Sequence, residues 1–272
     1  MQKFNANPTW VLGSLWRYRS LVGKLAWREI LGRYRGSVLG IVWSFVNPIL
    51  MLIVYTFVFT TVFRMRWGAG PESTSDFALM AFVGMTVHGV LAEALTKGPG
   101  LIVSNPSYVK KFVFPLESLA WTLVTGALFH AALSFAIVIG AVLLLHGTMH
   151  PTILLVPVVL LPLILISVGI AWLLASLGVF IRDIGQITGV LSTILLFVSP
   201  VFFPVNAFPE QFRALLYFNP LTPTIEQARE VMLRGGLPDW GTWSLMLVIG
   251  LATAAAGLAW FQKTRKGFAD VI

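Results

Sequence analysis

An uncharged apolar segment that directly follows a cluster of arginines constrains this chain more than any other feature. No Asp, Glu, Lys or Arg interrupts residues 38–63, whereas Arg28, Arg33 and Arg35 stand just before them. The hydrocarbon core of a bilayer is crossed by about 20 apolar helical residues. Only 11% of the chain is charged, compared with about 25% in soluble domains. We therefore expect an all-α, polytopic membrane protein.

Further uncharged runs predict six transmembrane helices. The run 118–181 is too long for one helix and contains the sequence HGTMHP at 146–151. Because Gly and Pro disfavour helix, two spans are expected there. The predicted spans cover residues 37–64, 77–96, 118–145, 152–180, 184–203 and 240–262. The other parts of this single domain are the N-terminal segment 1–36, the loop 97–117, the segment 204–239 and the tail 263–272.

The distribution of Lys and Arg predicts the orientation of these spans. With the N-terminus inside, 14 of these residues fall on inner segments and 5 on outer ones, together the 19 of the sequence. Because cytoplasmic loops are enriched in Lys and Arg, both termini are expected in the cytoplasm, and the protein in the cytoplasmic (inner) membrane. The net charge of +8 is thereby explained. Nucleic acid is not expected as a partner, because no soluble domain carries a basic patch.

The segment 17–35 is typical of an amphipathic helix that lies in the membrane interface. At 100° per residue its cations form one stripe, and Arg19 and Arg33 depart from it by falling on the apolar side. The stripe consists of Arg17, Lys24, Arg28 and Arg35, and the opposite side of Leu15, Tyr18, Val22, Ala26 and Ile30. The helix is either a positively charged anchor or a surface beside the entrance of a transport pathway.

Two segments outside the spans are predicted to form short helices. In the inner loop, Asn105-Pro106 favours a helix start, since Pro is tolerated in the first turn. Its exposed side chains either meet solvent or bind a soluble partner: Tyr108, Lys110 and Lys111. In the outer segment, prolines leave helical pieces too short to cross a bilayer, which we expect to re-enter the outer interface against protein. There Glu226, Arg229, Glu230 and Arg234 recur at helical spacing; they form either mutual ion pairs or a rim where a polar substrate leaves.

Several kinds of chemistry have no motif in this sequence. There is no G-x-x-x-x-G-K-[ST] loop for a nucleotide phosphate, no HExxH and no cysteine. We therefore expect no catalytic residue, no metal site and no cofactor on this chain. Glu93 and Lys97 at the end of the second span are expected to pair, and His88 and His130 to be neutral and bonded to neighbouring helices. Since the spans lack a central Asp or Lys, energy is expected from a partner rather than from an ion gradient.

Four motifs in order give the chain a resemblance to a known family. They are REILGRYRGSVLGIVWSFVNPILMLIVYTFVF, SNPSYVKKFVFPLE, GVFIRDIGQITGVLSTILLFVSPVFFP and YFNPLTPTIEQAREVMLRGG. Together they resemble the permease subunits of ABC-2-type polysaccharide exporters, which serve O-antigen, teichoic acid and capsular polymers. The resemblance implies a homodimer with two copies of a separate ABC ATPase, which would bind ATP and Mg, and a lipid-linked polysaccharide as cargo. The first-span block favours O-antigen.

The resemblance also implies roles for individual residues. The ATPase contacts would be Asn105, Pro106, Tyr108, Lys110 and Lys111, with Arg182 and Asp183 as a second contact. The substrate entrance would include Arg28, Arg33 and Arg35, and the outer rim Glu226, Arg229 and Arg234. Aromatic rings stack on sugars, so the pathway candidates are Trp43, Tyr55, Phe59, Phe197 and Phe202.

Three alternatives remain open at this stage. An ABC-2 exporter of a drug or small lipid would share this architecture but have a narrow, apolar pore. An integral-membrane glycosyltransferase would need acidic residues gathered for a metal or a general base, and the outer acids are scattered. A channel or scaffold would have no ATPase partner.

Overall fold

The computed structural model describes residues 9–62, 74–110 and 114–272, and all regular structure in these ranges is helical. Four helical stretches are long and apolar enough to cross a bilayer: Asp76–Lys97, Ser118–His146, Pro151–Phe180 and Trp240–Val271. Two shorter apolar stretches, Gly40–Thr56 and Ile184–Val198, correspond to the first and fifth predicted spans. The prediction of an all-α membrane protein is confirmed. Four of the six predicted spans coincide with long helices, and the other two coincide with shorter apolar helices.

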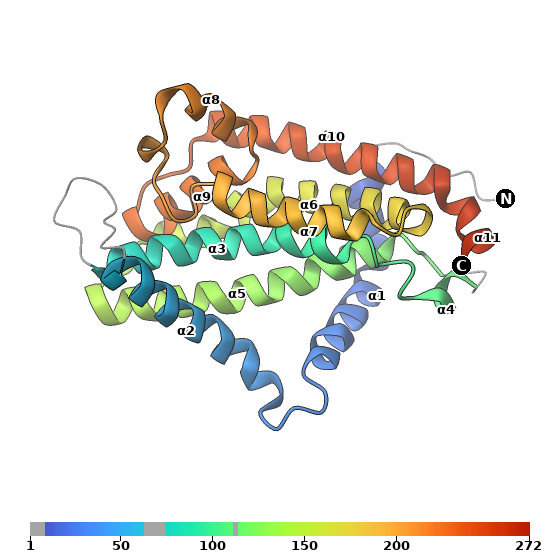
Figure 1. Cartoon of the computed structure of the whole chain (residues 1–272), viewed down its shortest axis with the longest axis horizontal. Helices are drawn as coiled ribbons and strands as arrows, with labels where there is room; N and C mark the ends of the chain where they lie inside the picture. The colour runs from blue at the N-terminus through green and yellow to red at the C-terminus, as the bar shows by residue number, and fades with distance from the viewer. Residues whose placement is uncertain (1–8, 63–73, 111–113) are drawn as a thin grey trace.

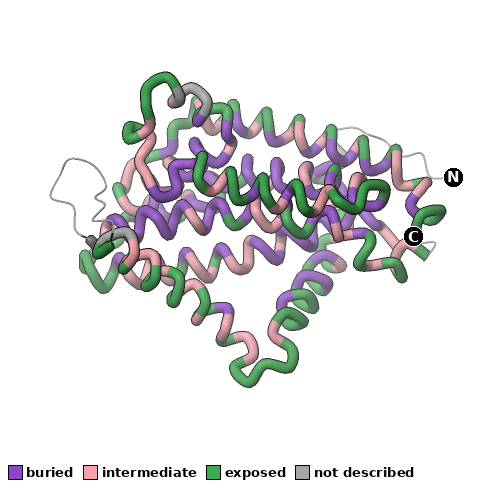
Figure 2. Tube along the Cα trace, in the orientation of Figure 1, coloured by how far each residue is buried: buried purple, intermediate pink, exposed green. Residues whose placement is uncertain are grey.

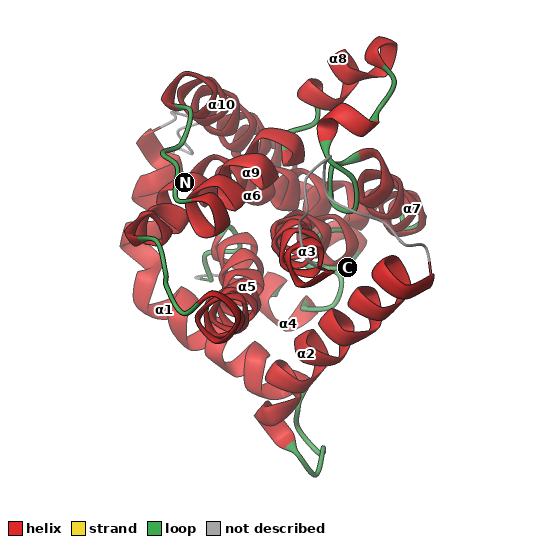
Figure 3. Ribbon diagram, turned by 90° about the vertical axis from the view of Figure 1, so that its left-hand side faces the viewer, coloured by secondary structure: helices red, strands yellow, loops and turns green. Residues whose placement is uncertain are grey.

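The long helices lie side by side and form the body of the molecule (Figure 1). They are α3 (Thr74–Lys97), α5 (Ser118–His146), α6 (Val156–Phe180, preceded by the turn η3, Pro151–Leu155) and α10 (Trp240–Thr264). α7 (Ile184–Val198) runs along them. In the end-on view α3 lies near the centre (Figure 3), which agrees with its burial. The chain ends in η6 (Arg265–Gly267) and α11 (Phe268–Val271).

The N-terminal part forms a V against this body (Figure 1). α1 (Thr9–Arg33) buries Val22, Ala26 and Ile30, as its sequence predicts, and leaves Trp16 and Trp27 exposed. A turn then leads through η1 (Gly40–Val42) into α2 (Trp43–Thr56) and the π-helical η2 (Phe57–Val62). These three elements follow one another without a loop.

Short helices occupy both ends of the body. α4 (Pro106–Val109) lies at the same end as α11, and α8 (Glu210–Phe218) at the other end (Figure 1). After the turn η4 (Val205–Ala207) and α8 come α9 (Leu221–Arg229) and the π-helical η5 (Glu230–Arg234). Each is too short to cross a bilayer.

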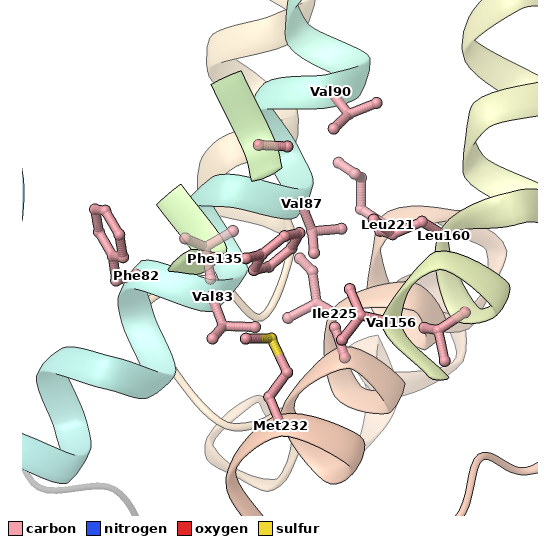
Figure 4. Packing of buried hydrophobic residues seen from close by; sticks show 14 of the residues in the cluster. Phe82, Val83, Val87, Val90, Phe135, Val156, Leu160, Leu221, Ile225 and Met232 are labelled. Atoms are coloured by element: carbon pink, nitrogen blue, oxygen red, sulfur yellow. The ribbon is translucent and has the colours of Figure 1, made fainter. Parts of the chain in front are cut away.

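The described residues form two hydrophobic clusters, and the larger one includes α9 and η5. Side chains from α3, α5, α6, α9 and η5 meet in Figure 4, with Val83, Leu221 and Ile225 fully buried. In Figure 2 the buried positions follow α3 and α6, whereas α7 is largely exposed. α9 and η5 are therefore part of the core rather than a peripheral loop.

Glycines allow α6 and α10 to approach at backbone distance. A Cβ at Gly257 would overlap the carbonyl of Gly169, and a Cβ at Gly250 would lie 2.7 Å from the carbonyl oxygen of Pro162. Such small residues permit close helix packing in membranes. The two helices therefore form one tightly packed unit.

Candidate functional site

A cavity of about 380 Å³ lies between α2, α3 and α5, next to the end of α1. Its lining combines aromatic rings, Tyr34, Trp43 and Tyr55, with the polar side chains Asn47 and Ser134. Rings and hydroxyl or amide groups together suit a ligand that has both apolar faces and hydrogen-bonding edges. The cavity therefore brings together Arg33, a predicted entrance residue, and Trp43 and Tyr55, two predicted pathway residues.

Pro48 lies inside α2 on the wall of this cavity. Proline has no N–H, so it cannot donate to the carbonyl four residues earlier, at Ser44. Ser44 also lines the cavity, and its hydroxyl donates to the carbonyl of Ile41 at 2.6 Å. The sequence of α2 thus places polar backbone and side-chain atoms beside the aromatic rings.

Charged residues form one end of the cavity. Arg33, at the end of α1, donates to the carboxylate of Glu93 on α3, and Lys97 donates to the same oxygen. The Glu93 side chain is 14% exposed, compared with 36% for Arg33 and 42% for Lys97. The predicted Glu93–Lys97 pair is confirmed. The additional partner, Arg33, explains why an arginine falls on the apolar side of α1.

Rings cover the junction between α1 and α5. Tyr34 contacts His130 edge-on at 6.2 Å, and Trp27 contacts Phe129 at 6.3 Å. Burial raises the pKa of the Tyr34 hydroxyl above its usual value. Nε2 of His130 is buried without a hydrogen-bond partner among the described residues. The expected bond to a neighbouring helix is therefore wrong for this atom.

The other intramembrane histidine behaves as predicted. Nε2 of His88, on α3, lies 3.1 Å from the carbonyl oxygen of Ser192 on α7. The bond crosses from one helix to its neighbour. His88 therefore connects α3 to α7.

Three of the five aromatic pathway candidates contact one another in a row. Tyr55 on α2 lies 5.7 Å from Phe202, and Phe202 lies 6.3 Å from Phe197 at the end of α7. Phe197 is exposed, but Phe202 is buried in the core, so its ring does not line an open surface as predicted. Trp43 shares the cavity with Tyr55. The side chain of Phe59 lies outside the described part of the structure.

The predicted ATPase-contact loop folds around α4. Asn105 precedes α4, and its Nδ2 donates to the carbonyl of Leu101 at 3.0 Å. Tyr108 stacks on Phe114, with ring centroids 4.2 Å apart. Pro106 and Lys110 are exposed. Lys111 lies outside the described residues.

The loop is attached to α1 through Arg28. Nη2 of Arg28 donates to the hydroxyl of Tyr108, and both residues line a second cavity of about 530 Å³. Arg28 therefore contacts the α4 loop rather than the first cavity, and its place at the substrate entrance stays a prediction. Arg35 is exposed in the turn after α1. Arg182 and Asp183 are exposed in the turn between α6 and α7.

The C-terminal segment also holds this loop. Arg265 donates to Glu117 Oε2 and to the carbonyl of Phe114, both at 2.9 Å. Nothing in the local sequence indicated this contact, because its partners are about 150 positions apart along the chain. The loop is thus fixed between α1 and the C-terminal segment.

Arg229 is not part of an outer rim, and this corrects the prediction. Its side chain is 0% exposed. The guanidinium donates to the carbonyls of Met80 (2.9 Å), Pro200 (2.6 Å) and Val201 (2.8 Å) and to Glu226 Oε1 (2.8 Å). Burial lowers its pKa to about 10, so the group stays charged at neutral pH. Arg229 fastens α9 to the core.

The other two predicted rim residues are partly exposed. The side chain of Glu226 is 32% exposed and pairs with Arg229. Arg234 is 43% exposed and lies 3.2 Å from Glu230. The helical spacing of these charges therefore reflects mutual pairing.

Comparison with known proteins assigns this architecture to a family. The model of the ABC-2 type transporter family matches residues 20–233, most of the chain. The chain belongs to the ABC-2 type transporter family. As an ABC-2 permease it is a membrane transport subunit and not an enzyme, and the family implies ATP hydrolysis on a partner ATPase subunit.

Relatives of this ABC-2 permease are similar over nearly their whole length. The O-antigen export system permease protein RfbA of Myxococcus xanthus is 29% identical over 262 residues, covering 95% of this chain and 97% of the relative. The capsule polysaccharide export inner-membrane protein CtrC of Neisseria meningitidis serogroup B is 25% identical, covering 92% of each. The polysialic acid transport protein KpsM of Escherichia coli is 23% identical, covering 86% of this chain and 90% of the relative.

Proposed function

We propose that this ABC-2 permease exports a lipid-linked polysaccharide across the cytoplasmic membrane, with O-antigen favoured over capsular polysaccharide and teichoic acid. The main support is the cavity between α2, α3 and α5, where Tyr34, Trp43 and Tyr55 stand beside amide and hydroxyl groups. A glycan presents apolar ring faces and hydroxyl edges, which these two kinds of side chain match. The relatives that serve O-antigen and capsule polysaccharide export support the same cargo class.

The proposal includes six spans with both termini in the cytoplasm. The helical path from Gly40 to Val62 supports the first span, since η1, α2 and η2 follow without a loop. The excess of Lys and Arg on the predicted inner segments supports the orientation. In this arrangement α4 faces the cytoplasm, where a soluble ATPase binds.

The proposal further includes a homodimer with two ATPase copies. α2 and α7 lie on the same side of α3 in the end-on view (Figure 3) and expose apolar side chains, including Ile53, Val54, Ile187 and Val190. A second copy would cover these faces and bring the exposed Phe197 rings of the two copies toward each other. The aromatic rings would then flank one path between two subunits.

Reconstitution tests the function directly. The chain is co-expressed with the ATPase encoded beside its gene, purified by a tag on this chain and placed in vesicles with lipid-linked glycan. We expect retained ATPase, and ATP-dependent movement of the glycan across the bilayer. A Walker-site variant of the ATPase is the matched control. If the ATPase is not retained, or glycan moves equally without ATP, the proposal fails.

A further inference from the structure

Two cations from different elements share one carboxylate oxygen at the charged end of the first cavity. Arg33 Nη2, at the end of α1, and Lys97 Nζ, at the end of α3, both donate to Oε1 of Glu93. The carboxylate is the least exposed of the three groups, at 14%. A buried carboxylate needs such partners because removing its hydration is costly. The three groups together carry one excess positive charge.

Neutralising Glu93 does not by itself require Arg33. Lys97 is four positions away on the same helix and already supplies one positive charge. Arg33 reaches Glu93 from 60 positions away and draws the end of α1 against α3. Beyond Arg33 the chain is an exposed turn that contains two glycines with positive φ, Gly36 and Gly40. The Arg33–Glu93 contact therefore fastens the end of α1 that precedes this turn.

We infer that Glu93 is an internal competitor for an anionic ligand, occupying the cations that would otherwise bind a phosphate group. The site comprises Arg33 and Lys97, and the ligand class is a phosphate ester carried on an amphipathic molecule. Arg33 and Glu93 line the same cavity as Trp43 and Asn47, so a phosphate beside Arg33 has its attached group among rings and amides. Lys97 lines the second cavity and reaches the same carboxylate oxygen. The inference deepens the proposed function and rests on it for the identity of the cargo.

A phosphate has the chemical means to displace the carboxylate. Its oxygens accept charge-assisted hydrogen bonds from both cations at once, and the planar guanidinium binds phosphate in a bidentate way. Exchange involves no covalent step. It replaces one anion by another and releases α1 from α3, because Glu93 provides the ion pair between them. A neutral ligand cannot replace the Glu93 carboxylate at the two cations, so only an anionic ligand releases α1.

Cysteine labelling tests this inference, since the chain contains no cysteine. Ser134→Cys introduces one thiol into the cavity lining. The complex of this chain with its ATPase, in lipid nanodiscs, is treated with a polar maleimide. We expect Glu93→Gln to raise the labelling rate by about tenfold, a change that corresponds to losing one well-formed ion-pair contact. Glu29→Gln is the matched control, because Glu29 is exposed on α1 and lines the second cavity instead.

The ligand class is tested with dodecyl phosphate as the probe and dodecyl maltoside as its neutral counterpart. Dodecyl phosphate is expected to protect Ser134→Cys from labelling, at about tenfold lower concentration in Glu93→Gln than with Glu93 present. Arg33→Gln is expected to abolish this protection. If Glu93→Gln fails to fold, Glu93→Asp tests the same contact, because it shortens the side chain by one methylene.

Defined outcomes overturn the inference. The inference fails if Ser134→Cys is labelled at the same rate with and without Glu93→Gln. It also fails if dodecyl phosphate and dodecyl maltoside protect the cysteine equally. These measurements need no transport. A complex that exports glycan but shows neither effect refutes the inference and leaves the proposed function standing. A complex that shows both effects but exports no glycan refutes the proposed cargo alone.

Discussion

Arg229 lies directly against Gly84, so that a Cβ at residue 84 would stand 2.8 Å from Arg229 Nη2 and 3.1 Å from the Cα of Val201. Because Gly84 on α3 has no side chain, there is room beside it for the buried guanidinium of Arg229 on α9. The guanidinium in turn takes up carbonyls of Met80, Pro200 and Val201. One glycine and one arginine thereby join three segments that are far apart in the sequence.

Gly84→Ala is expected to lower the free energy of unfolding by about 1–3 kcal/mol, because the added methyl group overpacks this contact. Gly89→Ala on the same helix is the matched control, since a Cβ there meets nothing within 4 Å. Thermal unfolding in detergent measures both. Equal unfolding temperatures for the two variants would contradict the role assigned to Gly84.

Arg229→Met is expected to cost about 3–5 kcal/mol of stability, because it leaves the buried carbonyls without their donor. Arg234→Met removes a half-exposed arginine paired within the same segment, and is expected to change stability by at most about 1 kcal/mol. Unfolding temperature and yield of the ATPase complex report the difference. If Arg229→Met lowers the unfolding temperature no more than Arg234→Met does, the four hydrogen bonds of Arg229 contribute little to stability.

Tyr108→Phe is expected to reduce transport per ATP hydrolysed by about two- to tenfold, the effect of losing one hydrogen bond. The variant keeps the stack on Phe114 but removes the acceptor of Arg28, which joins α1 to the α4 loop. Glycan movement and ATP turnover are measured in the same vesicles. Tyr217→Phe, at an exposed position at the other end of the body, is the control. Unchanged transport per ATP would show that the Arg28–Tyr108 bond does not connect ATP hydrolysis to transport.

Lys110→Glu combined with Lys111→Glu is expected to weaken ATPase retention at least about tenfold, because charge reversal places like charges at the proposed docking surface. Lys263→Glu with Lys266→Glu reverses two charges in the C-terminal segment and serves as the control. Co-purification at fixed salt measures retention. Full retention by the Lys110 and Lys111 variant would assign ATPase docking to another surface.

Gly257→Ala is expected to destabilise the fold by about 1–3 kcal/mol, since the new methyl group would overlap the backbone of Gly169. Gly140→Ala on α5 is the comparison, because a Cβ there has open space. The better helix propensity of alanine favours both variants equally. If both raise the unfolding temperature, α6 and α10 are less tightly packed than described.

Local sequence was sufficient to predict some features of the fold and of the site, but not others. Uncharged runs identify the four long helices, and periodicity identifies the face of α1 that buries Val22 and Ile30, because both depend on neighbours within a few turns. Arg229 was misplaced because its spacing to Glu226 is also typical of an exposed ion pair. The carbonyls that distinguish the two cases belong to α3 and to the segment after α7. Arg265 and Glu117 escaped prediction for the same reason.

The glycine contacts between α6 and α10 limit where this transporter moves. Two helices that touch backbone to backbone cannot slide without breaking many contacts at once, and we expect them to act as a stationary frame. Rearrangement during a transport cycle then falls to elements outside this frame, notably the end of α1, which is fastened to α3 through Arg33 and to the α4 loop through Arg28. Spectroscopic labels on α6 and α10 should therefore keep their separation when ATP is added, while labels on α1 and α3 move apart.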